Sequence, residues 1–193
     1  MTDPASNLLV SDFDYELPPE LIAQTPLAER DRSRLLVLDR TSGFINHSSI
    51  QDLPDWLRTG DLLVANNSRV IPARLHARRD GTGGRVELLL LHRDDAAVWT
   101  ALARPARRLH PGDRLVLAAT AAEGQLTATL EILERRENGM ILLRFLDHAE
   151  DRLEELGTVP LPPYIRTALN DPERYQTIYA TVPGSAAAPT AGL

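Results

Sequence analysis

The feature that most constrains the fold is a series of short apolar segments between residues 73 and 146, separated by turn signals. Residues 73–77 alternate apolar and polar side chains, which is the period of a strand with one buried face. Five further candidate strands follow, at residues 86–91, 98–103, 115–117, 126–133 and 141–145. Asn138-Gly139 favours a type I′ hairpin turn before the last of them. Six short strands at this spacing predict a small antiparallel barrel.

The flanking segments have a different character. Residues 35–38 and 62–65 are continuous apolar runs, which are typical of buried strands. Short helices are expected at residues 17–22, 50–57 and 148–156, with Gly157 as the left-handed glycine that ends the last one. Asp171-Pro172-Glu173 predicts an N-cap and a helix through Tyr175 and Gln176. The predicted fold class is therefore α/β, with an antiparallel barrel inserted into a discontinuous α/β domain.

Composition excludes several kinds of chemistry. The chain has no cysteine, which excludes disulfides, thiolate metal sites and a cysteine nucleophile, and all 21 of its basic residues are arginine. The five histidines lack metal-ligand spacing, and neither a His-Glu-x-x-His nor a Gly-x-Ser-x-Gly motif is present. No apolar run approaches the ~20 residues that span a bilayer. We expect a soluble, cytoplasmic protein that binds no metal and no membrane.

Charge is distributed unevenly along the chain. Residues 69–108 hold nine arginines and four acidic residues, a balance of +5, whereas the rest of the chain carries −11 and the whole chain −6. A basic centre in an acidic chain indicates an anionic partner such as a nucleic acid. The alternative is that arginine replaces lysine as the ordinary surface charge.

Three local segments are candidates for function. Asn66-Asn67-Ser68-Arg69 follows an apolar run, where amides could contact a base or sugar and the arginine an anion; the alternative is a simple asparagine turn. Pro160-Leu161-Pro162-Pro163-Tyr164-Ile165 could form a rigid pocket wall or a proline-rich linker. The small residues of the tail, 184–193, permit close approach to a ligand or form a flexible terminus.

Five segments together resemble one family, the QueA family of S-adenosylmethionine:tRNA ribosyltransferase-isomerases. They occur in the family's order and extend over the whole chain. They are Phe13-Asp14-Tyr15-Glu16-Leu17-Pro18, the stretch from Asp61 through Asn66-Asn67-Ser68-Arg69 to Leu75, Pro160-Leu161-Pro162-Pro163-Tyr164-Ile165, Tyr175-Gln176-Thr177-Ile178-Tyr179-Ala180 and Ala187-Ala188-Pro189-Thr190-Ala191-Gly192-Leu193.

The resemblance implies a fold and a reaction. The family combines an α/β domain with an inserted six-stranded Greek-key barrel, which here gives residues 1–72, a barrel at 73–147, and a continuation of the α/β domain at 148–193. The ribosyl group of S-adenosylmethionine moves onto 7-aminomethyl-7-deazaguanine at the wobble position of tRNA, giving epoxyqueuosine and releasing adenine and methionine. S-adenosylmethionine is a substrate, no separate cofactor is expected, and we expect a monomer. A noncatalytic RNA-binding fragment is the alternative.

Site residues follow from the matched motifs. Tyrosines would stack on a base or hold the sulfonium, amides would read base edges, and Arg69 would hold the methionine carboxylate. The predicted substrate-binding residues are Asn66, Asn67, Arg69, Arg74, Tyr164, Tyr175, Gln176, Tyr179, Pro189, Thr190 and Gly192. The predicted tRNA-binding residues are Arg78, Arg79, Arg104, Arg107 and Arg108. The catalytic base is not identified, with His47 and His76 as candidates beside the substrate amine itself.

The chain departs from the family in length. Family members are longer, and this sequence stops at Gly192-Leu193, where the motif continues with histidine and an aromatic residue. We therefore expect an amino-terminal part of such an enzyme, with the barrel and part of the cleft.

Overall fold

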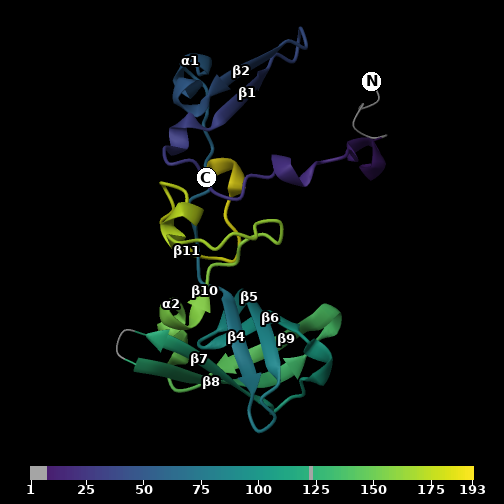
Figure 1. Cartoon of the computed structure of the whole chain (residues 1–193), viewed down its shortest axis with the longest axis vertical. Coiled ribbons are helices and arrows are strands. Elements are labelled where there is room, and N and C mark those ends of the chain that lie inside the picture. Colours follow the sequence, from purple (N-terminus) through teal and green to yellow (C-terminus); the bar gives the residue numbers. More distant parts are fainter. Residues whose placement is uncertain (1–7, 122–123) are drawn as a thin grey trace.

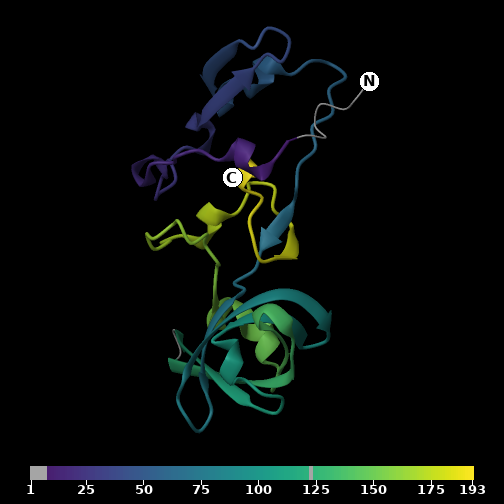
Figure 2. The ribbon, with the colours of Figure 1, turned by 90° about the vertical axis from the view of Figure 1, so that its right-hand side faces the viewer.

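The molecule is elongated, with three parts arranged along its long axis. A computed structural model describes residues 8–121 and 124–193. A β-barrel lies at one end and the β1–β2 hairpin at the other, with the C-terminal segments between them (Figures 1 and 2).

The barrel is a closed sheet of six antiparallel strands. Two three-stranded meanders, β4-β5-β6 and β7-β8-β9, are joined by β6–β9 and β4–β7 pairing, so the sheet closes on itself. Closure removes the unpaired edges that an open sheet would present. The strands are β4 (Arg74–Arg79), β5 (Arg85–Asp95), β6 (Val98–Arg104), β7 (Arg114–Ala121), β8 (Gly124–Arg135) and β9 (Met140–Phe145). The predicted fold class, with its six-stranded barrel, is confirmed.

Alternating side chains build the core of this barrel. In β4, Leu75 and Ala77 point inward while His76 and Arg78 face solvent, as the period-two pattern predicts. Burying aliphatic side chains completely stabilises the barrel by about 1.5–3 kcal/mol each. The largest fully buried side chains all belong to the barrel or its closing loop: Leu75, Leu88, Leu90, Leu109, Leu115, Leu117, Leu130, Ile132, Ile141 and Leu143.

Between the barrel and the hairpin, two short strands pair in parallel. They are β3 (Ser68–Val70) and β11 (Val182–Ser185), from segments more than 110 residues apart in the sequence. Strand β10 (Gly157–Thr158) follows α2 (Leu153–Leu156) and pairs with the first residues of β4. The chain therefore enters the barrel from the middle part and returns to the middle part at the same end of the barrel.

The far end of the molecule is a hairpin of β1 (Arg34–Leu38) and β2 (Ile45–Ser49), followed by α1 (Leu53–Trp56). Asp52 accepts hydrogen bonds from Ser48 and Ser49 and so fixes the turn from β2 into the helical segment. The remaining helical elements are single 3₁₀ turns at Val10–Phe13, Pro19–Leu21, Arg30–Arg32, Ile50–Asp52, Ala106–Arg108, Glu137–Gly139, Ala149–Arg152, Pro172–Tyr175 and Thr190–Gly192.

Two expectations about buried strands were wrong. Residues 62–65 form no strand, and Leu62, Leu63 and Val64 are 86%, 70% and 82% exposed. The reason is that β11 pairs only with Ser68–Val70, so no described strand lies beside this segment. Residues 35–38 do form β1, but its only described partner is β2, and Leu36 remains largely exposed.

Gly157 is a glycine for a reason other than the one predicted. It has an extended backbone instead of a left-handed one. A Cβ atom at this position would lie 1.9 Å from the carbonyl oxygen of Pro72. Close approach between the chain entering the barrel and the chain leaving it therefore requires glycine here. Likewise, the helix that begins at Asp171 ends at Tyr175, and Gln176 lies beyond it in an extended conformation.

Across residues 8–121 and 124–193, every helix is too short or too polar to cross a bilayer.

Candidate substrate-binding site

The candidate site is a hollow of about 420 Å³ between two segments from opposite ends of the sequence. Residues 23–33 form one wall and residues 161–175 form the other, and Thr190 and Leu193 also line the hollow. Tyr164 and Tyr175 both line it, and we call it the aromatic hollow. Its volume falls within the ~300–1,000 Å³ of typical small-molecule sites.

Gln24 joins the two walls near Tyr164. Its side-chain Nε2 donates to the carbonyl oxygen of Tyr164 at 3.0 Å, and its Oε1 accepts from the amide of Arg166 at 2.8 Å. The amide group thus satisfies both backbone groups that flank Ile165. This pair of hydrogen bonds fixes the backbone that carries the Tyr164 ring.

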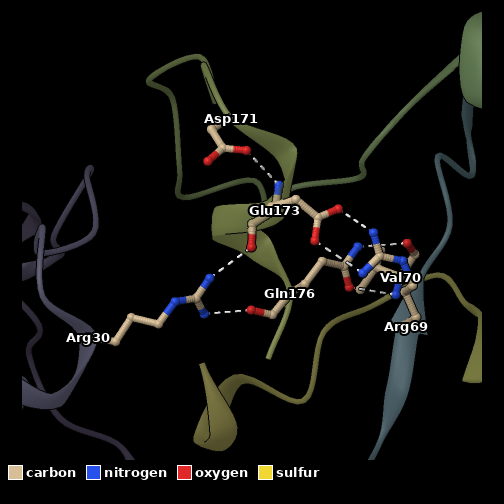
Figure 3. Close-up of polar contacts among 6 residues, drawn as sticks. All are labelled: Arg30, Arg69, Val70, Asp171, Glu173 and Gln176. Atoms are coloured by element: carbon tan, nitrogen blue, oxygen red, sulfur yellow. Dashed lines mark hydrogen bonds and ion pairs between the residues drawn. The ribbon is translucent and has the colours of Figure 1, made fainter. Parts of the chain in front are cut away.

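Two arginines join the walls at the other end of the hollow. Arg30 donates to the carbonyl oxygens of Glu173 and Gln176 (Figure 3). Arg174 reaches in the opposite direction and donates to the carbonyl oxygens of Leu27 and Ala28. The Glu173 carbonyl also accepts from the Gln176 amide at 3.1 Å, so Arg30 adds a second donor there and ties the end of this helical turn to the opposite wall. Sequence reasoning missed Gln24, Arg30 and Arg174, because each contacts backbone about 140 residues away and leaves no local pattern.

Tyr175 is the more buried of the two tyrosines in the hollow. Burial raises the pKa of its phenol, and the nearby Tyr164 phenol raises it further, against a backbone hydrogen bond with Ala188. Tyr164 is therefore close enough to affect the titration of Tyr175, whose raised pKa keeps its phenol neutral near neutral pH.

Arg69 is engaged by Glu173 in a two-pronged ion pair (Figure 3). The hydrogen bond and charge of Arg69 lower the pKa of Glu173, and the hydrogen bond of Glu173 raises the pKa of Arg69. Asp171 accepts a hydrogen bond from the Glu173 amide at 3.0 Å, as the predicted N-cap. Arg69 does not line the hollow, and its guanidinium is already paired.

Gln176 has a structural position. It is 4% exposed, donates from Nε2 to the Val70 carbonyl at 2.8 Å, and accepts from the Val70 amide at 2.9 Å. These two bonds imitate a strand pair and join the segment after Tyr175 to β3 (Figure 3). Both the oxygen and the nitrogen of its side-chain amide are thereby engaged by the Val70 backbone.

The two asparagines before Arg69 form a turn. The Oδ1 of Asn66 accepts from the Ser68 amide at 2.8 Å, which is an Asx turn. The carbonyl of Asn67 accepts from the amides of Thr181 and Val182 where β11 begins. Both side chains are exposed and lie outside the hollow.

The tail packs on Tyr179. A Cβ atom at Gly192 would lie 2.2 Å from the hydroxyl oxygen of Tyr179, so the glycine allows this contact. Thr190 lines the hollow, whereas Tyr179, Pro189 and Gly192 do not. The structure therefore gathers Tyr164, Tyr175 and Thr190 in one hollow, whereas Gln176, Arg69 and Asn67 do not line it.

The predicted RNA-binding arginines, taken together with the predicted substrate-binding Arg74, divide into two groups. Arg79 is half-buried and pairs with Asp113 at 3.1 Å, and Arg74 lies 3.7 Å from Glu87 and donates to the Leu161 carbonyl. Four are exposed with no acidic partner among the described residues: Arg78, Arg104, Arg107 and Arg108. Arg85, which was not predicted, shares a shallow surface hollow with Arg78, Arg104 and His76.

This exposed group lies away from the aromatic hollow. Thr158 pairs with Arg74 at the start of β4, while Arg78 pairs with Arg85 near its other end. At ~3.3 Å per residue the two ends of β4 are separated by roughly 17 Å. The hollow that holds Arg78 and Arg104 is separate from the one that holds Tyr164 and Tyr175, so only an extended ligand would reach both.

The two candidate histidines are exposed and apart from the aromatic hollow. His47 lies on β2 in the distal hairpin, and His76 lies on the outer face of the barrel opposite Glu87. Within residues 8–121 and 124–193, acidic and histidine side chains form no group of three that would hold a metal ion.

Comparison with known proteins places this arrangement in a family. The chain belongs to the family described as queuosine biosynthesis proteins, whose model matches residues 10–193. Two similar relatives are named S-adenosylmethionine:tRNA ribosyltransferase-isomerase. The protein of Carboxydothermus hydrogenoformans is 52% identical over 184 residues, and that of Staphylococcus haemolyticus is 50% identical over 186. Each match covers 95% of this chain and 53% of the relative.

A solved structure is also similar. It is the S-adenosylmethionine tRNA ribosyltransferase of Thermotoga maritima, 41% identical, with 77% of this chain and 49% of that one covered at a TM-score of 0.37. The chain spans about half the length of the curated relatives that it matches.

Proposed function

We propose that this chain acts in queuosine biosynthesis as a tRNA ribosyltransferase-isomerase that consumes S-adenosylmethionine. The observation that carries the proposal is the match over residues 10–193, together with relatives of that name that are about half identical to the chain. The barrel and the aromatic hollow supply two separate binding surfaces, which a reaction with a macromolecular acceptor and a small donor needs.

The proposed reaction converts two substrates into three products. The aminomethyl nitrogen of 7-aminomethyl-7-deazaguanine in tRNA forms a bond to a ribosyl carbon and loses a proton, while the carbon–sulfur bond to methionine and the glycosidic bond to adenine break. Rearrangement of the ribosyl group expels adenine and methionine and leaves the epoxide of epoxyqueuosine on the tRNA. A proton beside the sulfonium has to be removed first, because only then can the ribosyl carbon skeleton rearrange.

Barrel arginines support the RNA half of this proposal. Arg78, Arg85, Arg104, Arg107 and Arg108 are exposed, and each can neutralise a phosphate. Arg79 is excluded from this role because Asp113 already pairs with it. A surface of unpaired guanidinium groups beside one another is typical of phosphate-backbone contact.

The base remains unassigned within this proposal. Neither His47 nor His76 lines the hollow that contains Tyr164 and Tyr175. His76 instead lies beside Arg78, Arg85 and Arg104 on the barrel. This position suits contact with RNA better than proton removal from a donor bound in the aromatic hollow. The acceptor amine itself is the remaining candidate from the sequence.

A transfer assay tests the proposal. The chain is incubated with S-adenosylmethionine labelled separately in adenine and ribose, and with tRNA that carries 7-aminomethyl-7-deazaguanine. Release of labelled adenine together with ribose label on the tRNA is the expected result, and tRNA with unmodified guanine at the wobble position is the control. Retention of tRNA without adenine release, at enzyme concentrations comparable to substrate, would contradict a complete transferase and favour the noncatalytic RNA-binding alternative.

A further inference from the structure

The aromatic hollow has walls that select a particular kind of ligand. Two phenol rings, Tyr164 and Tyr175, face a space otherwise lined largely by aliphatic groups such as Leu27, Leu161 and Ile165. Flat heterocycles stack on such rings, and each base–aromatic stack contributes about 1–3 kcal/mol. The volume of about 420 Å³ accommodates one nucleoside-sized group.

Cations in this hollow are already engaged. Arg30 and Arg174 are the guanidinium groups among its lining residues, and both donate to backbone carbonyls that hold the walls together. Using either of them for a ligand would break the contact between the walls. A phosphate or carboxylate therefore finds no available cation here, which disfavours an anionic group as the occupant.

Among the polar side chains of the hollow, Asn170 and Asp171 can still form hydrogen bonds with a ligand. Asn170 lines the hollow, and its side chain makes no hydrogen bond to the described residues. Asp171 uses Oδ1 to cap the helix, which leaves acceptor capacity on its carboxylate. One amide and one carboxylate beside two aromatic rings match the hydrogen-bonding edge of a purine-like base.

We propose that the hollow between residues 23–33 and 161–175 binds an uncharged, purine-like heterocycle, stacked by Tyr164 and Tyr175 and read at its edge by Asn170 and Asp171. This inference rests on the proposed function, which offers two sources of such a ring. One is the adenine of S-adenosylmethionine, and the other is the 7-deazaguanine of the tRNA. Gln24 and Arg30 are positioning residues, since they hold the walls and do not contact the ligand.

The two sources differ at the edge of the ring. A guanine-type ring presents two N–H donors side by side, which pair with a carboxylate such as Asp171. Adenine presents one donor beside one acceptor, which pair with an amide such as Asn170. Asp171→Asn keeps an N-cap residue and removes the carboxylate, so it separates the two sources without removing the helix cap.

Binding by calorimetry tests the site without requiring turnover. The probes are adenosine, S-adenosylmethionine and free 7-aminomethyl-7-deazaguanine, each titrated into the whole chain. Tyr164→Leu and Tyr175→Leu are expected to weaken the bound probe at least tenfold, while Tyr175→Phe, which keeps the ring, retains binding. Tyr15→Leu is the matched control, because Tyr15 is 74% exposed and lies outside the hollow.

Each outcome decides the inference. Loss of binding with Asp171→Asn alone assigns the ring to the tRNA base, and loss with Asn170→Ala alone assigns it to the donor adenine. Equal affinity in Tyr164→Leu, Tyr175→Leu and Tyr15→Leu would overturn the site. Absence of saturable binding for all three probes would also overturn it. The proposed function fails separately, in the transfer assay, where adenine release is measured and not affinity.

Discussion

Replacing Gln176 by alanine removes two hydrogen bonds that join the C-terminal segment to β3. The Val70 amide and carbonyl are the partners, and the wild-type side chain is 4% exposed. A buried backbone group left without a partner costs about 1–3 kcal/mol. Two such groups, partly rehydrated in the variant, give an expected loss of about 2–4 kcal/mol in the local free energy of opening.

Hydrogen exchange at the Val70 amide measures this loss directly. Because 1.4 kcal/mol is a factor of ten, exchange is expected to accelerate roughly 30- to 700-fold in Gln176→Ala. Ile178→Ala serves as the control, since Ile178 is 85% exposed on the same segment and its truncation changes stability by less than about 0.5 kcal/mol.

The barrel is expected to be unaffected by the same substitution. Trp99 lies in the barrel and is 6% exposed, so its fluorescence reports barrel unfolding in urea once Trp56 is replaced by phenylalanine. The urea midpoint reported by Trp99 is expected to stay the same in Gln176→Ala. Less than fivefold acceleration at Val70, or a shift of the barrel midpoint as large as the local effect, would refute this reasoning.

Three further predictions concern the barrel. Gly157→Ala should lower the melting temperature sharply, because the new Cβ would lie 1.9 Å from the carbonyl oxygen of Pro72. Gly84→Ala is the control and should leave the melting temperature unchanged, because its Cβ would have no atom nearer than 3.7 Å. Equal melting temperatures of the two variants would contradict the close approach at Gly157. The Glu150 pKa is lowered, since hydrogen bonds from Arg93, Trp99 and Ala97 together outweigh the burial that raises it. The stabilisation that ionised Glu150 gives to the folded state is therefore complete above the unfolded pKa of ~4.3 and is lost as the pH falls through the folded pKa. Between pH 7 and pH 3 the urea midpoint should therefore fall less in Glu150→Gln than in the wild type. Parallel pH profiles of the two proteins would count against this prediction. Arg107→Ala should weaken tRNA binding and reduce the salt slope by about one, while Arg79→Ala, already paired with Asp113, should leave the slope unchanged; the reverse order would exclude the exposed group as the RNA surface.

The barrel was predictable because its signals are local. Alternation at residues 73–77 matches the inward Leu75 and outward His76 of β4. Asn138 and Gly139 both adopt the positive φ that a tight turn demands, at 56° and 79°. Side-chain period and turn chemistry act over two to four residues, so they can be read from the sequence without knowing which strands pair.

Residues 62–65 show where the same reasoning stops. A continuous apolar run forms a buried strand only if another strand or helix covers it. The sequence of the run does not reveal which segment of the chain that partner is. Here the described partner, β11, begins to pair at Ser68.

The domain boundaries at residues 72/73 and 147/148 stay predictions.

Site residues were predictable by type more than by role. Tyr164, Tyr175 and Thr190 lie together in the hollow, as residues of one site would. Gln176 and Arg69 lie close by but contact protein groups, because Val70 and Glu173 come from distant parts of the sequence. No local pattern signals that an amide or a guanidinium will be occupied by such a partner. The assigned substrate contacts of the predicted residues likewise stay predictions.

We expect RNA to contact the barrel arginines while a heterocyclic ring occupies the aromatic hollow. Hydrogen exchange measured by mass spectrometry, with and without S-adenosylmethionine and tRNA carrying 7-aminomethyl-7-deazaguanine, tests both parts at once. Slower exchange is expected in the peptides that contain residues 104–108 and in those that contain residues 161–175. Unchanged exchange at residues 161–175, under conditions in which the tRNA is fully bound, would rule out the hollow as the binding site of the ring.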